Sequence, residues 1–290
     1  MNMDRLFYLA SDFVDKMRVD VDGTYAQVFD KKDSRMAVER KAQIRIDGDG
    51  PSFMFCAGHQ EIGFVVGVVP DNDPRANGDG NVFAMEQVRD GAVVKPWRAS
   101  DLPKATHALK DTFRDKRNLD AAAVLNGADR YDVTIGGDGV ALCSENHPHK
   151  HGVWSNTFKT QQDLNRLSLA AALDQIGNGF VDDQGLKIRA RGKQLIVPRN
   201  LEEAAHTALD RLEGHEEMRR TPIVWDALAH PCHWFIKTNI PGLMWFERVP
   251  IEFGTWRDDR TGMVLIKGYE RRCFQYMDPR SVFGSLPSGG

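Results

Sequence analysis

The pattern of hydrophobic and polar positions changes period along the chain, and each change predicts a different element. Residues 62–69 and 82–88 have the apolar content of strands, and they flank a polar tip at residues 71–81. Two strands joined by such a tip predict a long β-hairpin. The carboxylates of the tip superficially match a calcium loop, but the fifth position, which needs an oxygen ligand, is Arg75. Turn chemistry is therefore the better explanation of the tip.

Helical periodicity begins after residue 100. Apolar side chains recur mostly every three or four residues over residues 101–127, opposite a charged face, and this predicts a long helix. We expect that face to be solvated, although contact with another chain stays open. A second helix is expected around residues 168–177, with Ser168 as its N-cap and Gly177 at its end.

A third helix is predicted over residues 201–212, where Asn200 is suited to the N-cap and Glu203 to a capping box. Between the second and third helices, residues 194–197 have the composition of a short buried strand. After residue 221 the pattern changes to strands separated by turn residues, at residues 223–225, 233–237, 244–253 and 263–276.

The first 40 residues combine a short amphipathic stretch with a charged tract. The apolar positions of the stretch are Leu6, Phe7, Leu9, Ala10, Phe13, Val14 and Met17. One interpretation is a surface helix. Because an isolated helix this short is marginally stable in water, the other is an extended arm that docks its apolar stripe on a neighbouring chain. Both interpretations stay open.

Composition indicates a folded protein with one large domain or two smaller ones. The 290 residues are 41% hydrophobic and 27% charged, which is ordinary for a globular chain. Basic and acidic side chains number 38 and 41, so no global charge draws the chain to a nucleic-acid backbone. No apolar run approaches the roughly twenty residues that span a bilayer, which argues against membrane insertion. Four scattered cysteines form no CxxC pair and are expected to be reduced thiols.

One cluster of potential transition-metal ligands stands out, formed by His147, His149 and His151 with Cys143 and Glu145 nearby. A proline and a glycine in this segment favour a loop. Three such ligands at two-residue spacing, without a distant fourth, make a weak metal site. The cluster keeps a metal-dependent enzyme open as an alternative function.

Other catalytic patterns fail at particular positions. His215 begins a zincin-like helix, but the second histidine of that motif falls on Arg219. A phosphate loop starting at Gly185 has the wrong glycine spacing, and Gln194 replaces its hydroxyl residue. Neither a nucleophile elbow nor a dinucleotide fingerprint is present. The sequence therefore assigns no catalytic, cofactor-binding or metal-binding residue, and we predict that the chain is not an enzyme.

A cationic stripe, defined as Lys187, Arg189, Arg191 and Lys193, alternates with small and apolar residues. A strand at this place would carry four cations on one face. Contact with packaged nucleic acid or with a partner's carboxylates is one explanation. A solvated strand edge guarded by cations is the commoner one, and we favour it.

Several short motifs follow one another in a distinctive order over the second part of the chain. The first group comprises Gly137-Asp138-Gly139, residues 142–148, Ser155-Asn156, residues 167–177, residues 185–188 and residues 195–202. The second group comprises residues 234–238, Phe246-Glu247-Arg248, Thr261-Gly262 and residues 278–285. This order resembles that of the major capsid proteins of tailed phages, in the branch of Mu-like head subunits. The resemblance covers about residues 100–285 and weakens before residue 100.

The resemblance implies an α+β fold of the Hong Kong 97-like capsid type. It implies an N-terminal arm at residues 1–40 and an extended hairpin loop, or E-loop, at residues 41–98. A peripheral domain would comprise residues 99–139 and 246–290, including a spine helix at residues 101–127. Residues 140–245 would form the axial domain.

The function implied is that of a major capsid protein that self-assembles into hexamers and pentamers. These would form the icosahedral head of a virion around double-stranded DNA, without sequence-specific binding and without a cofactor. Implied partners are copies of the chain itself, with scaffold, portal and decoration proteins, and assembly is expected in the host cytoplasm. A cellular shell of the same fold that encloses cargo is a further alternative, next to the metal-dependent enzyme using His147, His149 and His151.

Overall fold

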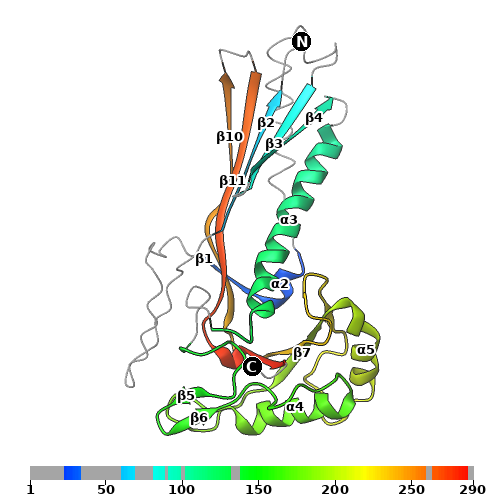
Figure 1. Ribbon diagram of the computed structural model, residues 1–290, viewed down its shortest axis with the longest axis vertical. Helices are drawn as coiled ribbons and strands as arrows, with labels where there is room; N and C mark the ends of the chain where they lie inside the picture. The colour runs from blue at the N-terminus through cyan, green and yellow to red at the C-terminus, as the bar shows by residue number, and fades with distance from the viewer. Residues whose placement is uncertain are drawn as a thin grey trace. The chain divides into compact units, whose positions relative to one another are not determined.

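The computed structural model describes seven stretches of the chain, namely residues 23–33, 60–68, 81–88, 91–98, 102–131, 138–258 and 263–286. The amphipathic stretch near the N-terminus and most of the polar hairpin tip lie outside these residues. Within the described stretches helices and strands are mixed (Figure 1). No helix among them is long and apolar enough to cross a membrane.

The chain divides into two compact units. The first unit comprises Met1–Gly23, His59–Arg117 and Glu247–Arg272. The second unit comprises Thr24–Gly58, Asn118–Phe246 and Cys273–Gly290. This division does not by itself identify a peripheral or an axial domain.

The first unit is built on antiparallel strands that are far apart in sequence. β2 (Gln60–Val68) pairs with β3 (Asn81–Val88), and β3 pairs with β4 (Gly91–Arg98). On its other side, β2 pairs with β11 (Met263–Tyr276). In the sheet, β11 lies between β2 and β10 (Leu243–Asp258). The predicted hairpin is confirmed, and the structure adds that it joins a larger sheet (Figure 1).

The predicted long helix is also confirmed, as α3 (Leu102–Asn126). Its residues up to Arg117 belong to the first unit, and those from Asn118 onward belong to the second. In the second unit its last two turns bury small and branched apolar side chains, including Ala121, Ala122 and Leu125.

A four-stranded sheet forms the middle of the second unit, in the order β12-β9-β7-β8. These strands are β7 (Gly192–Val197), β8 (Ile223–Val224), β9 (Trp234–Thr238) and β12 (Val282–Ser285). β7 and β8 are parallel, while the β7–β9 and β9–β12 pairs are antiparallel. The strands predicted at residues 194–197, 223–225 and 233–237 are confirmed, whereas β12 was not predicted.

Both faces of this sheet are buried, because alternate residues of each strand enter different cores. Leu195 and Ile236 lie in one hydrophobic cluster, whereas Ile196 and Phe235 lie in the other. Side chains that alternate along a strand point to opposite faces, so a sheet whose strands carry apolar residues at successive positions must be covered on both sides. The second unit is therefore a three-layer structure.

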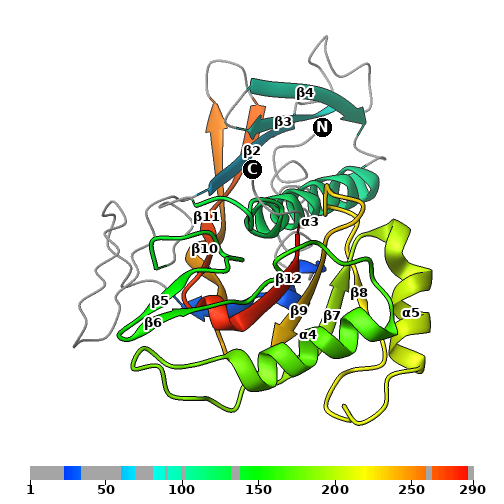
Figure 2. The same ribbon diagram turned by 60° about the horizontal axis from the view of Figure 1, so that its bottom comes forward.

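Different helices cover the two faces (Figure 2). α4 (Arg166–Gly179) and α5 (Glu202–Asp210) contribute to one cluster. The end of α3 and the short α2 (Tyr25–Val28) contribute to the other. β1 (Asp30–Asp33) follows α2 and lies next to β10 in sheet order. Segments from both ends of the chain thus complete this core.

The caps of α4 differ from the prediction. Asn165, not Ser168, is the N-cap, and its side chain accepts from the backbone nitrogens of Leu167 and Ser168. Ser168 Oγ accepts from the backbone nitrogen of Asn165, which completes a capping box. The helix also continues past Gly177 to Gly179. The predicted cap was wrong because asparagine and serine both suit an N-cap, and Ser168 lies only three residues after Asn165.

The predicted cap of α5 is wrong as well. A 3-10 turn (Arg199–Leu201) precedes the helix, and Leu201 occupies the N-cap without a side-chain hydrogen bond. Asn200 instead donates from Nδ2 to the carbonyl oxygen of Pro231 at 2.6 Å.

The expectation of four reduced thiols also needs correction. Cys143 and Cys232 are free, but Cys273 is disulfide-bonded, a pairing that depends on tertiary placement rather than spacing.

Candidate functional site

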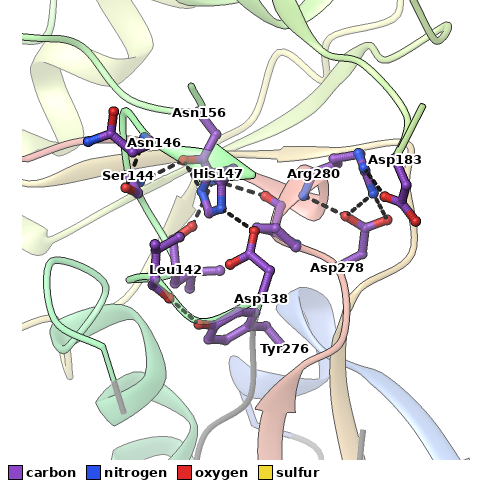
Figure 3. Close-up of polar contacts among 12 residues, drawn as sticks. Asp138, Leu142, Ser144, Asn146, His147, Asn156, Asp183, Tyr276, Asp278 and Arg280 are labelled. Carbon is purple, nitrogen blue, oxygen red and sulfur yellow. Dashed lines mark hydrogen bonds and ion pairs between the residues drawn. The ribbon is translucent and has the colours of Figure 1, made fainter. Parts of the chain in front are cut away.

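A buried polar cluster centred on Asn156 joins several segments of the second unit (Figure 3). Asn156 has no exposed surface. Its Nδ2 donates to the carbonyl oxygens of Leu142 at 2.8 Å, Pro279 at 3.0 Å and Val282 at 3.1 Å. One side chain therefore joins the loop after residue 138 to the C-terminal segment.

The amide oxygen of Asn156 serves the other side of the cluster. Oδ1 accepts from the backbone nitrogen of Ser144 at 2.9 Å and lies 2.9 Å from Nε2 of His147. Rotating the amide by 180° would place NH2 against the Ser144 donor and oxygen against three carbonyls. The hydrogen-bond pattern therefore fixes the orientation of this side chain.

His147 is held on both ring nitrogens. Nδ1 lies 2.8 Å from Oδ2 of Asp138, and Nε2 faces Asn156. The ring stacks on Trp154 with centroids 4.6 Å apart and an interplanar angle of 24°. His147 is fully buried, and neither nitrogen has a free lone pair directed at solvent. This histidine is part of the core of the second unit.

The segment of three histidines is a hairpin, not the expected loop. β5 (His147–His149) pairs antiparallel with β6 (Gly152–Trp154). Its sheet position turns His147 inward, while His149 is half-buried and His151 is exposed. Pro148 and Gly152 are compatible with so short a pair of strands.

The three histidines do not converge on one point. His149 lies against Gly185, where a Cβ would come within 2.8 Å of its Nδ1 and where φ is +83°. His147 already uses both nitrogens. Over the stretches that the structure describes, no three histidine, cysteine or acidic side chains are placed to hold a metal ion. In this geometry the histidines cannot act together as ligands.

A second set of contacts surrounds Arg280, next to the cluster (Figure 3). Its guanidinium donates to the carbonyl oxygen of Val181 at 2.6 Å and pairs with Asp183 at 2.5 Å and with Asp278 at 3.3 Å. It also lies over the ring of Trp154, 5.3 Å from the centroid. Burial alone lowers the pKa of Arg280, but Asp278 and Asp183 outweigh it and raise the pKa.

The C-terminal strand is tied to the residues after Asn156. The backbone nitrogen of Gly284 donates to the carbonyl oxygen of Asn156 at 3.0 Å, and Thr157 Oγ1 donates to that of Gly284 at 2.7 Å. Gly284 leaves no room for a side chain, since a Cβ would lie 2.6 Å from Sγ of Cys143. The close approach requires glycine at this position.

Cys143 is the free thiol closest to the cluster, and its chemistry is that of a packing residue. It is 6% exposed. Burial, and to a smaller extent Asp129, raises the pKa of the Cys143 thiol far above its usual value. A thiol that stays protonated is a poor nucleophile and a poor metal ligand.

The cationic stripe does not lie on a strand edge, so that expectation was wrong. Lys193 is in β7, which lies between β8 and β9, and residues 187–191 precede the strand. Arg191 and Lys193 both form ion pairs with Glu217, the latter at 2.5 Å. Lys187 and Arg189 are exposed. The stripe is thus partly neutralised by the loop after α5.

Sequence reasoning named Asn156 and residues 278–285 only as parts of motifs and did not find their contacts. Asp138 and Arg280 were likewise not singled out. The available signal was indirect: a run of three polar residues, Ser155-Asn156-Thr157, between aromatic residues, and an Asp-Pro-Arg turn at residues 278–280. A pattern of this kind shows that a polar group is present but not which distant carbonyl it satisfies.

Comparison with solved structures finds likeness to a virus-like particle, a phage-related protein and an encapsulin complex. The chain is similar to the virus-like particle of Pyrococcus furiosus, at 14% identity and a TM-score of 0.46, over 98% of this chain and 100% of that chain. It is similar to a phage-related protein from Bordetella bronchiseptica RB50, at 11% identity and 0.47, over 96% and 98%.

A third likeness is to the holo-SrpI encapsulin complex from Synechococcus elongatus, at 7% identity and a TM-score of 0.49, over 91% and 88% of the two chains. All three TM-scores are below 0.5. No protein-family model matches the chain, and no curated protein matches it.

Proposed function

We propose that the chain is a structural subunit that self-assembles into the icosahedral head of a tailed phage, with no catalytic step of its own. Hexamers and pentamers are the expected rings, because head-to-tail contacts that complete a rotation close into rings. We expect the shell to enclose double-stranded DNA. The further partners that we expect are scaffold, portal and decoration proteins.

The observation that carries this proposal is the convergence at Asn156. The segments that resemble capsid proteins are short and widely separated in sequence. In the structure, Leu142, Asn156 and residues 279–282, all from those segments, meet in one set of hydrogen bonds. Motifs that form one buried core in this way act as construction elements.

The long elements of the first unit fit the contacts that a shell needs. We assign the β2–β3 hairpin to the extended loop, α3 to the spine helix, and residues 140–245, with β7, β8 and β9, to the axial domain. The N-terminal arm belongs to residues 1–40. Contacts made by segments outside the parent core are individually weak and jointly strong, which permits correction of errors during assembly.

Charge is compatible with an enclosed genome that must be packaged and released. The formal net charge is -3, and half of the cationic stripe is paired with Glu217. An inner wall with many unpaired cations would hold phosphates tightly and resist movement of the DNA.

Shortening the hairpin tests the proposal. A variant that replaces residues 71–80 with a two-residue turn removes the tip and leaves β2 and β3 in place. The account predicts an unchanged unfolding transition together with a loss of large assemblies in sedimentation velocity. Assembly equal to that of the unmodified chain would contradict the role of the hairpin.

Two measurements separate the alternatives. The nucleic-acid content of purified particles distinguishes a phage head from a cellular shell that encloses other cargo. Metal analysis before and after chelation addresses an enzyme using His147, His149 and His151. Stoichiometric metal with hydrolytic activity would replace the present proposal with that one.

A further inference from the structure

A tight turn in the second unit exposes an apolar side chain next to cations, and we call residues 182–189 the Leu186 turn. Leu186 is 66% exposed, and Lys187 and Arg189 are exposed as well. Neither cation forms an ion pair with another described side chain. The backbone nitrogen of Lys150 donates to the carbonyl oxygen of Asp183 at 2.9 Å, which brings a further exposed lysine next to the turn.

The Leu186 turn is held in one shape by its own hydrogen bonds. Oδ1 of Asp182 accepts from the backbone nitrogens of Gln184 at 2.9 Å and of Leu186 at 2.8 Å. The backbone nitrogen of Asp182 also donates to the carbonyl oxygen of Leu186 at 2.8 Å. Gly185 has a φ of +83°, a conformation that favours glycine. A side chain presented on a fixed turn loses less conformational entropy when a partner covers it.

A hollow of about 260 Å³ lies between the end of α4 and the loop after α5, also in the second unit. Its inner wall is apolar and includes Leu173, Ala190 and Met218, all of them buried. Sites for small organic ligands usually measure about 300–1,000 Å³ and enclose most of the ligand. This hollow therefore suits a single protruding side chain better than a cofactor or a substrate.

The rim of the hollow is negatively charged. Asp174 and Glu216 lie on it, are exposed, and form no ion pair with any described side chain. Glu217 also lies there, but Arg191 and Lys193 pair with it. The carboxyl end of α4 adds a partial negative charge, which no basic residue in its last turn offsets. An aliphatic side chain followed by cations matches this apolar wall and acidic rim.

The turn and the hollow belong to different faces of one chain. The turn packs on the β5–β6 hairpin, where Gly185 lies against His149, whereas the hollow is bounded by the loop that follows α5. This hairpin and α5 lie on opposite sides of the second unit (Figure 2). None of residues 182–189 lines the hollow of its own chain. The occupant that the charges favour is therefore the Leu186 turn of a second copy.

We propose that the Leu186 turn of one copy docks into the hollow of the next, with Leu186 on the apolar wall and Lys187 and Arg189 at the acidic rim. The contact joins two different surfaces, so a pair of copies still has one free turn and one free hollow. Such contacts continue from copy to copy until a ring closes. The inference rests on the proposed shell function, for which it names one ring-forming interface.

Exchange of charges tests the pairing in the full chain, after nuclease treatment. The turn variant carries K187E and R189E, and the rim variant carries D174K and E216K. Each variant should lower the fraction of chain in complexes larger than a monomer at least about tenfold in sedimentation velocity, because like charges then meet at every interface of a ring. All four substitutions together should restore association. R166E is the control, since Arg166 is exposed at the other end of α4.

Three outcomes would overturn the inference and leave the shell function standing. The first is association of the turn variant equal to that of the unmodified chain. The second is a combined variant that associates no better than the turn and rim variants. The third is a turn variant that associates normally but binds a short double-stranded DNA more weakly, which would assign the turn to nucleic acid.

A cross-link reports the contact even where no closed shell forms. Leu186→Cys and Asn178→Cys in one chain place one thiol on the turn and one at the hollow. Cys232→Ser removes an exposed free thiol from every variant. With a mild thiol oxidant, the double variant should form a ladder of disulfide-linked oligomers on a non-reducing gel, and the two single variants should not.

The absence of this ladder would overturn the inference whatever the chain assembles into. A ladder without curved or closed particles would instead support the contact and count against the shell function. The two proposals therefore fail in different measurements.

Discussion

The side-chain nitrogen of Asn156 donates to the carbonyl oxygen of Val282 at 3.1 Å, which fixes the start of β12 against the middle of the chain. β12 is an edge strand that pairs only with β9 among the described strands. An edge strand has one row of unsatisfied backbone groups. The contacts from Asn156 and Thr157 therefore supply what a neighbouring strand otherwise would.

Asn156→Ala should lower the free energy of unfolding by about 3 kcal/mol or more, because it leaves several buried polar groups without partners. Urea unfolding of the full chain measures the change. Asn146→Ala is the control, since Asn146 is exposed and is expected to change stability by less than about 0.5 kcal/mol. Equal effects of the two substitutions would refute the central position of Asn156.

A buried ionic group in the first unit supports a second prediction. Glu270 accepts from Nη2 of Arg117 at 2.5 Å and from Arg272, and all three residues are at most 5% exposed. Glu270→Gln removes the negative charge between two buried cations and should cost about 3–5 kcal/mol. The exposed Glu252, on β10 of the same unit, provides the control as Glu252→Gln. Comparable thermal unfolding of both variants would contradict this account.

The capping pattern of α4 and α5 leads to a third prediction. Asn165→Ala removes an N-cap and should destabilise the chain by about 1 kcal/mol. Asn200→Ala removes an exposed hydrogen bond that does not cap a helix, and should cost less than about 0.5 kcal/mol. Denaturant midpoints of the two variants provide the comparison. A larger loss in N200A would restore the sequence-based assignment of that cap.

His233 supports a prediction about the pH dependence of stability. Burial, and next the stacked His230 ring at 4.2 Å, lowers the pKa of His233, while Asp129 offsets part of this. As pH falls below about 6.5, the unfolded chain gains a proton at this histidine that the folded state does not bind. Stability should therefore decrease on the acid side.

His233→Gln should remove that part of the acid-side loss. Unfolding free energies between pH 5 and 7 check it, with the exposed His206→Gln as a control. Parallel curves for H233Q and the unmodified chain would show that His233 does not contribute.

Elements with a long, regular pattern were predictable from sequence. α3 was found almost to its ends because its apolar period continues over many turns, and the hairpin of β2 and β3 was found because two strands flank a polar tip. The sheet partners of these strands were not predictable. That β2 pairs with β11 depends on residues some two hundred positions away in the chain.

At the site, too, the sequence identified some of the residues but not the contacts that they make. His147 stood out as one of three histidines, but its role came from Asp138 and Asn156, which only the fold brings to its two nitrogens. The cationic stripe was visible in the sequence, but its place outside a strand edge and the pairing of Arg191 and Lys193 with Glu217 came only from the structure. The local sequence pattern indicates whether a side chain is buried or exposed. The residue that it contacts is known only from the tertiary structure.

Electron microscopy of the purified full-length chain, under conditions that support head assembly, tests the central claim most directly. The account predicts closed icosahedral particles with fivefold and sixfold rings of subunits. A field of small, discrete oligomers without curved or closed assemblies would contradict it.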